Sequence, residues 1–183
     1  MKPISSLKFF FLTNFSNPVC NRAIYRAIKK SKASSILEIG MGNANRSETM
    51  IRVAKKFSRY GNIRYTGIDT FEANHDSPIT LKDCHQRLGK LGAKIQLVPG
   101  DVFSSLHRIA NSHTRTDLLI ISSGVQKQAL EKSWFYVPRM LHAASTVFLQ
   151  GENDLDGKFE KLSRIEIERL VKASSDIRIK AAA

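Results

Sequence analysis

The sequence predicts an α/β fold in which a mostly parallel sheet carries helices on both faces. Short apolar segments alternate five times with longer segments of helical periodicity, the order that βαβ units produce. The apolar segments are continuous, as in Leu118-Leu119-Ile120-Ile121, so we expect both faces of each strand to be buried. At 183 residues, without an internal repeat or a linker, residues 1–183 are expected to form a single domain.

The first 34 residues are expected to be a helical segment. Asn17-Pro18 is typical of a helix start, with Asn as the N-cap and Pro in the first helical position, and this helix should run to about Lys32. A core then spans residues 35–151. Its strands are expected at residues 36–39, 63–69, 94–98, 117–122 and 146–149, and its helices at about 46–60, 80–91, 104–111 and 128–142.

Residues 152–183 are expected to add one helix and a last strand. Ser163 and Glu166 have the spacing of a capping box, which predicts a helix over about 164–173. Residues 176–180 alternate between polar and apolar, and we expect them to form a sixth strand.

The composition is strongly basic, with a formal net charge of +13. Between Arg22 and Arg64 the only acids are Glu38 and Glu48, and such an asymmetry is typical of a nucleic-acid or acidic-membrane face, or of a solvated helix surface. Cys20 and Cys84 match no metal or redox spacing. No segment has the length of a membrane span, so we expect a cytoplasmic protein with no membrane partner.

The most informative segment is residues 35–46, where a short strand runs into a glycine turn and then a helix. Gly40 and Gly42 allow the backbone around Met41 to turn tightly and to approach a ligand closely. Glu38 lies two residues before the first glycine, where its carboxylate can accept hydrogen bonds from ligand hydroxyls or an amine. This acid-x-Gly-x-Gly pattern resembles the first motif of class I S-adenosylmethionine-dependent methyltransferases, although Ala44 stands where that family often has a third glycine.

The ends of the later strands extend the resemblance over about residues 36–151. The family's Rossmann-like fold would place these strand ends at one edge of the sheet. The resemblance implies that Asp69 binds the ribose of S-adenosylmethionine, with Thr70 or Phe71 against the adenine. Asp101 and Val102 would meet the adenine, and Ser122 would lie near the reactive methyl group. Glu38, Gly40, Met41 and Gly42 would hold the methionine part of the donor.

Two other interpretations of these residues remain open. A dinucleotide fingerprint requires Gly-x-Gly-x-x-Gly, but Asn45 occupies the position of its third glycine, so a dinucleotide is the weaker candidate. The acids can also be purely structural, with Asp101 capping the helix that follows it and Asp69 fixing a turn.

The acceptor is less clearly marked than the donor. Residues 67–72 resemble small-molecule O-methyltransferases, which implies a small-molecule oxygen acceptor, and the basic composition makes RNA the alternative. No carboxylate follows Ser122 to hold Mg²⁺, so we expect no metal. His75 is a weak candidate for a base. The missing acid and a C-terminus shorter than in the family favour a third alternative, a non-catalytic binding protein.

Trp134 has two interpretations. The first is core packing against the sheet, and the second is a homodimer contact or a wall for the substrate.

Overall fold

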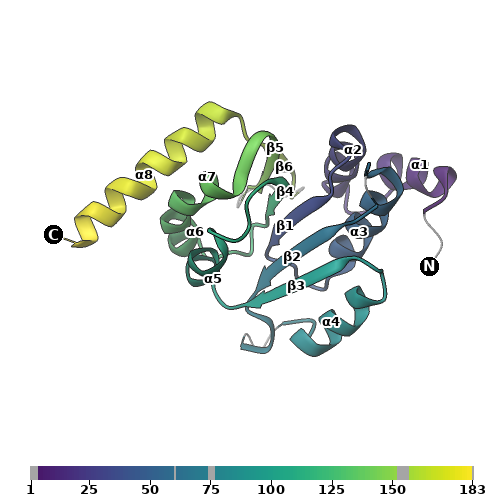
Figure 1. Cartoon of the computed structure of the whole chain (residues 1–183), viewed down its shortest axis with the longest axis horizontal. Coiled ribbons are helices and arrows are strands. Elements are labelled where there is room, and N and C mark those ends of the chain that lie inside the picture. Colours follow the sequence, from purple (N-terminus) through teal and green to yellow (C-terminus); the bar gives the residue numbers. More distant parts are fainter. Residues whose placement is uncertain (1–3, 60, 74–76, 152–156, 183) are drawn as a thin grey trace.

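A six-stranded sheet in the order β3-β2-β1-β4-β5-β6 forms the centre of the computed structural model, which describes residues 4–59, 61–73, 77–151 and 157–182 (Figure 1). β1 to β5 are parallel, and β6 is antiparallel to β5. The expected mostly parallel α/β fold is thereby confirmed. The strands are β1 (Ser35–Ile39), β2 (Arg64–Asp69), β3 (Lys94–Pro99), β4 (Thr116–Ile121), β5 (Leu141–Gln150) and β6 (Phe159–Lys161).

Helices cover both faces of the sheet and enclose two hydrophobic cores. One core lies under α1 (Ser6–Asn14), α2 (Asn21–Ser31), α3 (Asn45–Phe57) and α4 (Leu81–Gly89). The other lies under α5 (Val102–Ile109), α6 (Lys127–Ser133), the 3-10 turn η2 (Trp134–Tyr136), α7 (Val137–Met140) and α8 (Arg164–Ala182). A second 3-10 turn, η1 (Phe71–Ala73), follows β2.

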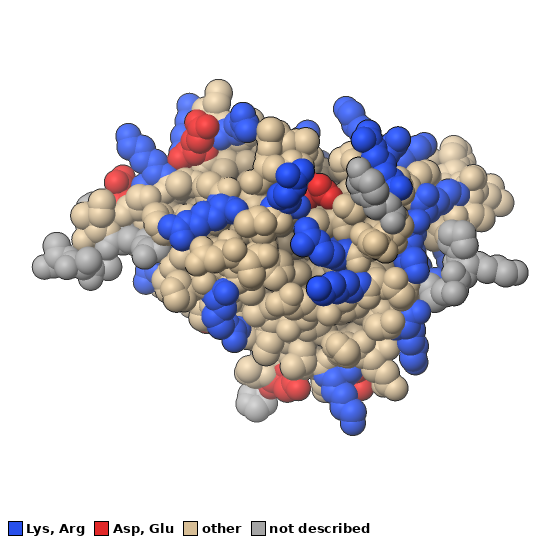
Figure 2. Space-filling model, in the orientation of Figure 1, with Lys and Arg blue, Asp and Glu red and all other residues tan. Residues whose placement is uncertain are grey.

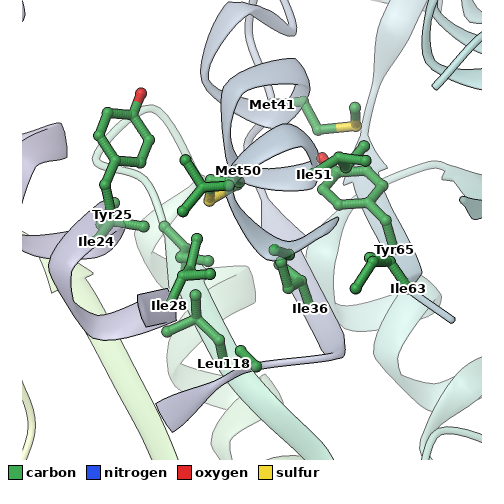
Figure 3. Close-up of a cluster of buried hydrophobic side chains, with 14 of the residues drawn as sticks. Ile24, Tyr25, Ile28, Ile36, Met41, Met50, Ile51, Ile63, Tyr65 and Leu118 are labelled. Atoms are coloured by element: carbon green, nitrogen blue, oxygen red, sulfur yellow. The ribbon is translucent and has the colours of Figure 1, made fainter. Parts of the chain in front are cut away.

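The core between α2, α3 and the sheet supports the loop that follows β1. Ile24 and Ile28 of α2 and Met50 of α3 lie over the strands in Figure 3, and all three side chains are 0% exposed. Burial of each such side chain stabilises the fold by roughly 1.5–3 kcal/mol. The end of β1 is therefore held in a rigid setting, which is what a binding turn requires.

The N-terminal segment differs from its prediction, because it forms two helices. α1 is capped by Ser5, whose hydroxyl accepts a hydrogen bond from the amide of Lys8 at 3.1 Å. α2 begins at Asn21 instead of Pro18, and the Asn17–Pro18 peptide bond is cis. The chain forms tight turns before α2, and in one of them the amide of Asn21 donates to Pro18 O at 3.2 Å. The helical pattern of the sequence therefore begins earlier than the helix itself.

The predicted helix over 128–142 is divided into α6, η2 and α7, and β5 then begins at Leu141. Pro138 lies in the first turn of α7, where the amide hydrogen that proline lacks is not needed for a helical hydrogen bond. In the interior of one continuous helix over 128–142, the same proline would break the helix. Trp134 is 2% exposed and belongs to the second core, which confirms the core-packing interpretation.

The prediction of a strand at 176–180 is wrong, because these residues lie within α8. The capping box is confirmed: Ser163 N donates to Glu166 Oε2 at 2.6 Å and Glu166 N to Ser163 Oγ at 3.3 Å. Ser174, which is 1% exposed, then fastens the helix by donating to Lys132 O at 3.0 Å. This packing outweighs the strand-like alternation, and the last strand is instead β6, which the sequence analysis missed.

Each helix in the described ranges is too short or too polar to span a bilayer.

Candidate functional site

Two adjoining cavities lie at the carboxyl ends of the parallel strands, beside β1 and β4, where the strand order reverses. The larger measures about 790 Å³ and the smaller about 390 Å³, and both sizes fall in the usual range of ligand sites. Gly40, Asp69, Thr70 and Gly124 line both cavities. An elongated ligand can therefore occupy the two together.

The glycine turn after β1 forms one wall of the larger cavity. Gly40 and Gly42 have φ angles of +78° and +59°, a conformation that L-residues rarely adopt. A Cβ on Gly40 would lie 3.0 Å from Ser122 Cβ, whereas a Cβ on Gly42 would meet no atom within 4 Å. Gly40 is thus needed for packing, and Gly42 leaves open space on the cavity side.

Asp69, at the end of β2, holds this turn in place. Its Oδ2 accepts hydrogen bonds from the amides of Met41 at 2.7 Å and Gly42 at 3.0 Å, and its Oδ1 accepts from Thr70 N at 2.7 Å. The Thr70 hydroxyl also donates to Oδ1, at a long 3.4 Å, and because a hydroxyl can rotate, a ligand hydroxyl can take its place. The turn-fixing interpretation is confirmed, and the same side chain still lines both cavities.

Glu38 lies beneath the turn and is fully buried. Its Oε1 accepts from Arg46 Nε at 2.7 Å, and its Oε2 accepts from Ser47 Oγ at 2.6 Å and from the Tyr65 hydroxyl. Three protein donors therefore occupy the carboxylate, and Glu38 is not among the described residues that line the larger cavity. In the structure, Glu38 therefore binds and positions Arg46.

Arg46 is the functional candidate that the sequence analysis missed. Its guanidinium donates from Nη2 to Gly40 O at 3.0 Å and to Ser122 Oγ at 2.6 Å, and it lies 5.1 Å from the centre of the Phe159 ring. Burial lowers the pKa of this guanidinium, but the charge of Glu38 and its hydrogen bond outweigh burial and raise it. A signal existed: a cation in the first turn of α3 opposes the helix dipole and indicates a specific partner.

Ser122, after β4, completes the contact between the glycine turn and α3. Its hydroxyl donates to Gly40 O at 2.7 Å while it accepts from Arg46, and the residue lines the larger cavity. The structure thus brings Ser122 to the glycine turn, as the sequence pattern predicts.

The predicted adenine contacts are distributed around the smaller cavity. Asp101 and Val102 line it. The Asp101 carboxylate caps α5 by accepting from Phe103 N at 2.9 Å and Ser104 N at 3.1 Å, which confirms the capping interpretation. Thr70 also lines this cavity, whereas Phe71, 1% exposed and with a φ of +47°, is packed in the first core.

The outer wall of the larger cavity comes from the N-terminal segment, which the sequence analysis did not connect with the site. It is neutral and mostly polar. Burial raises the pKa of Tyr25 to about 12, so its phenol stays protonated at neutral pH and donates rather than acting as a base. The residues of this wall are Leu12, Ser16, Asn17, Pro18, Cys20, Asn21 and Tyr25.

His75, the candidate base, lies outside the described residues. Within the part of the chain that the structure describes, no three His, Cys, Asp or Glu side chains come together as a metal site.

Comparisons with known proteins agree on the fold. No protein-family model matches the sequence, and no curated protein is similar enough to match. Solved structures do match. An O-methyltransferase from Bacillus cereus in complex with S-adenosylhomocysteine has a TM-score of 0.53 at 15% identity, over 95% of this chain and 69% of that one. The O-methyltransferase TomG from Streptomyces achromogenes, in complex with S-adenosylmethionine, gives 0.55 at 12%, over 90% and 69%.

A TehB-like S-adenosylmethionine-dependent methyltransferase from Corynebacterium glutamicum gives 0.51 at 15% identity, over 82% of this chain and 70% of that one. Similarity at this level concerns the fold. The chain has the Rossmann-like fold of the class I S-adenosylmethionine-dependent methyltransferases.

Proposed function

We propose that this chain binds S-adenosylmethionine across the two adjoining cavities and transfers its methyl group to a small-molecule oxygen acceptor. The observation that carries the proposal is the turn at the end of β1, whose amides Asp69 fixes and whose Gly42 leaves room for a ligand. The fold supports it, because ligands of open parallel sheets bind at this edge.

Each part of the donor has a chemically matched neighbour in this arrangement. The adenine would lie in the smaller cavity beside Val102, and a ribose hydroxyl would replace the long hydrogen bond from the Thr70 hydroxyl to Asp69 Oδ1. The methionine part would follow the glycine turn in the larger cavity. Arg46 and Asp69 are the charged side chains among the described residues that line this cavity, so Arg46 is the cation available for the donor's carboxylate.

The chemistry asks little of the protein beyond alignment. When bound, the donor supplies a methyl group already activated by its sulfonium. The chain's residues would hold donor and acceptor at attack distance, which is the main source of rate in such a displacement. A base is needed only for a poorly acidic hydroxyl, and the raised pKa of Tyr25 makes its phenol a donor that orients the acceptor oxygen.

A small acceptor is favoured by the wall that the N-terminal segment builds over the larger cavity, since its neutral amides and hydroxyls suit a polar organic molecule. RNA is the alternative acceptor, supported by the net charge of +13. Donor binding without turnover is the remaining alternative.

Calorimetric titration with S-adenosylmethionine and S-adenosylhomocysteine tests the donor site, and Gly42→Ala locates it. A methyl group at Gly42 would project into the proposed donor path, so we expect donor affinity to fall at least about tenfold. Gly61→Ala is the matched control, because Gly61 has a φ of +67° and equally open space but does not line either cavity. Each variant should lose about 1–2 kcal/mol of stability. No binding to wild type, or equal effects of the two variants, would refute the donor site.

Transfer of a labelled methyl group to a panel of phenols, catechols and hydroxy acids, with short RNAs alongside, tests the acceptor. Labelling of an oxygen in a small molecule supports the proposal. Labelling of RNA alone favours the alternative acceptor, and donor binding without any labelled product favours a non-catalytic protein.

A further inference from the structure

An exposed apolar patch covers the outer side of α1 and the segment after it. Five of the seven large hydrophobic residues that are exposed in the described part of the chain lie within 13 positions of sequence. Their exposed fractions range from 55% to 70%. A concentration of this kind on a small protein indicates an interaction site. The apolar patch consists of Leu7, Phe10, Phe11, Phe15 and Val19.

The patch is separate from the packing that holds α1 to the protein. Phe9, on the inner side of α1, is 8% exposed and packs edge-to-face on Phe57 of α3, with ring centres 4.7 Å apart. On the outer side, the Phe15 ring lies 6.0 Å from Phe10 and 5.3 Å from Phe11. The outer aromatic residues thus form a cluster of their own, and the fold does not need them for its core.

The charged residues near this patch in the sequence are all cations. The first 37 residues contain seven Lys and Arg and no Asp or Glu. Several cations contact α1 or the chain just after it: Arg26 Nη2 donates to Thr13 O at 2.6 Å, and Arg22 Nε to Ser16 O at 3.0 Å. Lys56 Nζ donates to Ser6 Oγ at 3.0 Å. In Figure 2 the tan surface at the end of the molecule where Figure 1 places α1 is flanked by blue side chains.

We propose that the apolar patch and its surrounding cations dock this protein on an anionic lipid bilayer. Half-exposed aromatic and aliphatic side chains on α1 and the segment after it would enter the boundary between headgroups and acyl chains. The Lys and Arg side chains around them would meet the negative headgroups, each contributing to attraction at the surface. The sequence suggested no membrane partner because no segment is long enough to span one, but docking on a surface needs no span.

Two other occupants fit the patch less well. In a symmetric pair of copies, the same surface of each copy would face the other, and the cations near one patch would repel those near the other. Single-stranded RNA requires aromatic faces that are free to stack, whereas the Phe15 ring packs against the rings of Phe10 and Phe11.

Docking would also orient the larger cavity. Leu12, Ser16 and Pro18, which line that cavity, belong to the same segment as the patch. The cavity would then lie beside the headgroups, and molecules that partition into lipid would be concentrated near it. The docking proposal stands apart from the proposed function, because vesicle binding is measured without donor or acceptor.

Flotation with vesicles tests the proposal directly. One set is phosphatidylcholine alone and the other contains roughly one-third phosphatidylglycerol. We expect the full chain to bind the anionic vesicles at least about tenfold more tightly than the neutral ones, with the difference shrinking in high salt. The variant Phe10→Ser/Phe11→Ser/Phe15→Ser should bind at least about tenfold more weakly than wild type.

Matched controls separate the patch from general effects of hydrophobicity and charge. Ile165→Ser/Ile179→Ser removes two residues of α8 that are 63% and 68% exposed, and it should leave vesicle binding unchanged. Lys8→Glu, on α1 within the patch, should weaken binding, and Lys82→Glu, on α4, should weaken it less. Circular dichroism and unfolding of each variant check that the fold is retained.

Three results would overturn the proposal. The first is no binding to anionic vesicles by folded wild type. The second is equal binding by the patch variant and the α8 control. The third is self-association or RNA binding that is lost with the three Phe residues while vesicle binding is absent.

Discussion

β1 is held at each end by an aspartate from a neighbouring strand, and the two ends differ in whether the aspartate lies beside a cavity. At the amino end, Asp117 of β4 accepts hydrogen bonds from Ser34 N at 2.8 Å and Ser35 N at 2.9 Å. At the carboxyl end, Asp69 of β2 accepts from the amides of Met41 and Gly42. The two arrangements use the same chemistry at opposite edges of the sheet.

The difference lies in the surroundings of the two carboxylates. Asp117 also accepts from Ser34 Oγ at 3.1 Å and lies 3.0 Å from His142 Nε2, and it lines neither cavity of the site. Asp69 also accepts from the Thr70 hydroxyl, at a long 3.4 Å, and it lines both cavities. Amide-binding aspartates at strand ends are therefore structural by default, and a replaceable hydrogen bond beside open space marks the one that can also bind a ligand.

The largest effect is expected at the charge pair beneath the carboxyl edge. Arg46→Met would leave Glu38 buried without its cation, which should reduce the free energy of unfolding by about 3–5 kcal/mol. Urea denaturation measures the loss. Arg52→Met, on the same helix, removes a cation that pairs with the partly exposed Glu48 and should cost no more than about 0.5 kcal/mol.

The double variant Glu38→Gln/Arg46→Met should recover part of the stability, because the uncompensated charge is then absent. Similar losses for Arg46→Met and Arg52→Met would mean that the carboxyl edge does not depend on this buried pair.

Asp117→Ala should give the next largest loss, at the amino edge. The amides of Ser34 and Ser35 would lose a charged acceptor, and we expect the free energy of unfolding to fall by about 2–3 kcal/mol. Affinity for S-adenosylmethionine, measured by calorimetry on the folded variant, should stay within about twofold of wild type. A large loss of donor affinity would mean that the two edges are coupled.

Asp69→Ala should act mainly on the ligand. If Asp69 accepts a ribose hydroxyl, donor affinity should fall about tenfold to a hundredfold, as expected for a hydrogen bond to a charged group. The loss of stability should be smaller than for Asp117→Ala, because the hydrogen bond from Gly42 N to Asp69 is exposed and water can replace the carboxylate there, whereas the amide bonds to Asp117 are partly buried. Unchanged affinity would remove the ribose assignment while leaving the donor site to be judged from Gly42→Ala.

The sequence predicted the parts of this comparison that depend on local patterns. Continuous apolar strands and the glycine turn identified the carboxyl edge, and Asp69 and Ser122 were placed there correctly because parallel strands end together. The capping roles also followed from spacing, as Ser163 and Glu166 illustrate.

What could not be predicted depends on contacts between distant residues. Arg46 acquires its place from Glu38 and from Ser122, 76 positions away, and no local pattern encodes that geometry. The strand assigned to 176–180 failed because packing of α8 through Ser174 outweighed alternation. Likewise, the sequence could not indicate that the N-terminal segment would cover the larger cavity.

The smallest expected effect is on the acid side of the stability profile. Burial raises the pKa of Asp117, but hydrogen bonds from Ser34, Ser35 and His142 outweigh burial and hold it below its usual value. A carboxylate whose pKa is lower in the folded than in the unfolded chain stabilises the fold above about pH 4, and the contribution is lost as the pH falls further. The difference in unfolding free energy between wild type and Asp117→Asn should therefore shrink from about pH 6 to pH 3. Asp101→Asn, at the carboxyl edge, should show the same sign with a smaller amplitude. Its carboxylate, whose pKa is lowered chiefly by the Ser104 hydroxyl, is exposed to solvent. A difference for Asp117→Asn that stays constant or grows on acidification would show that its hydrogen bonds do not favour the charged form.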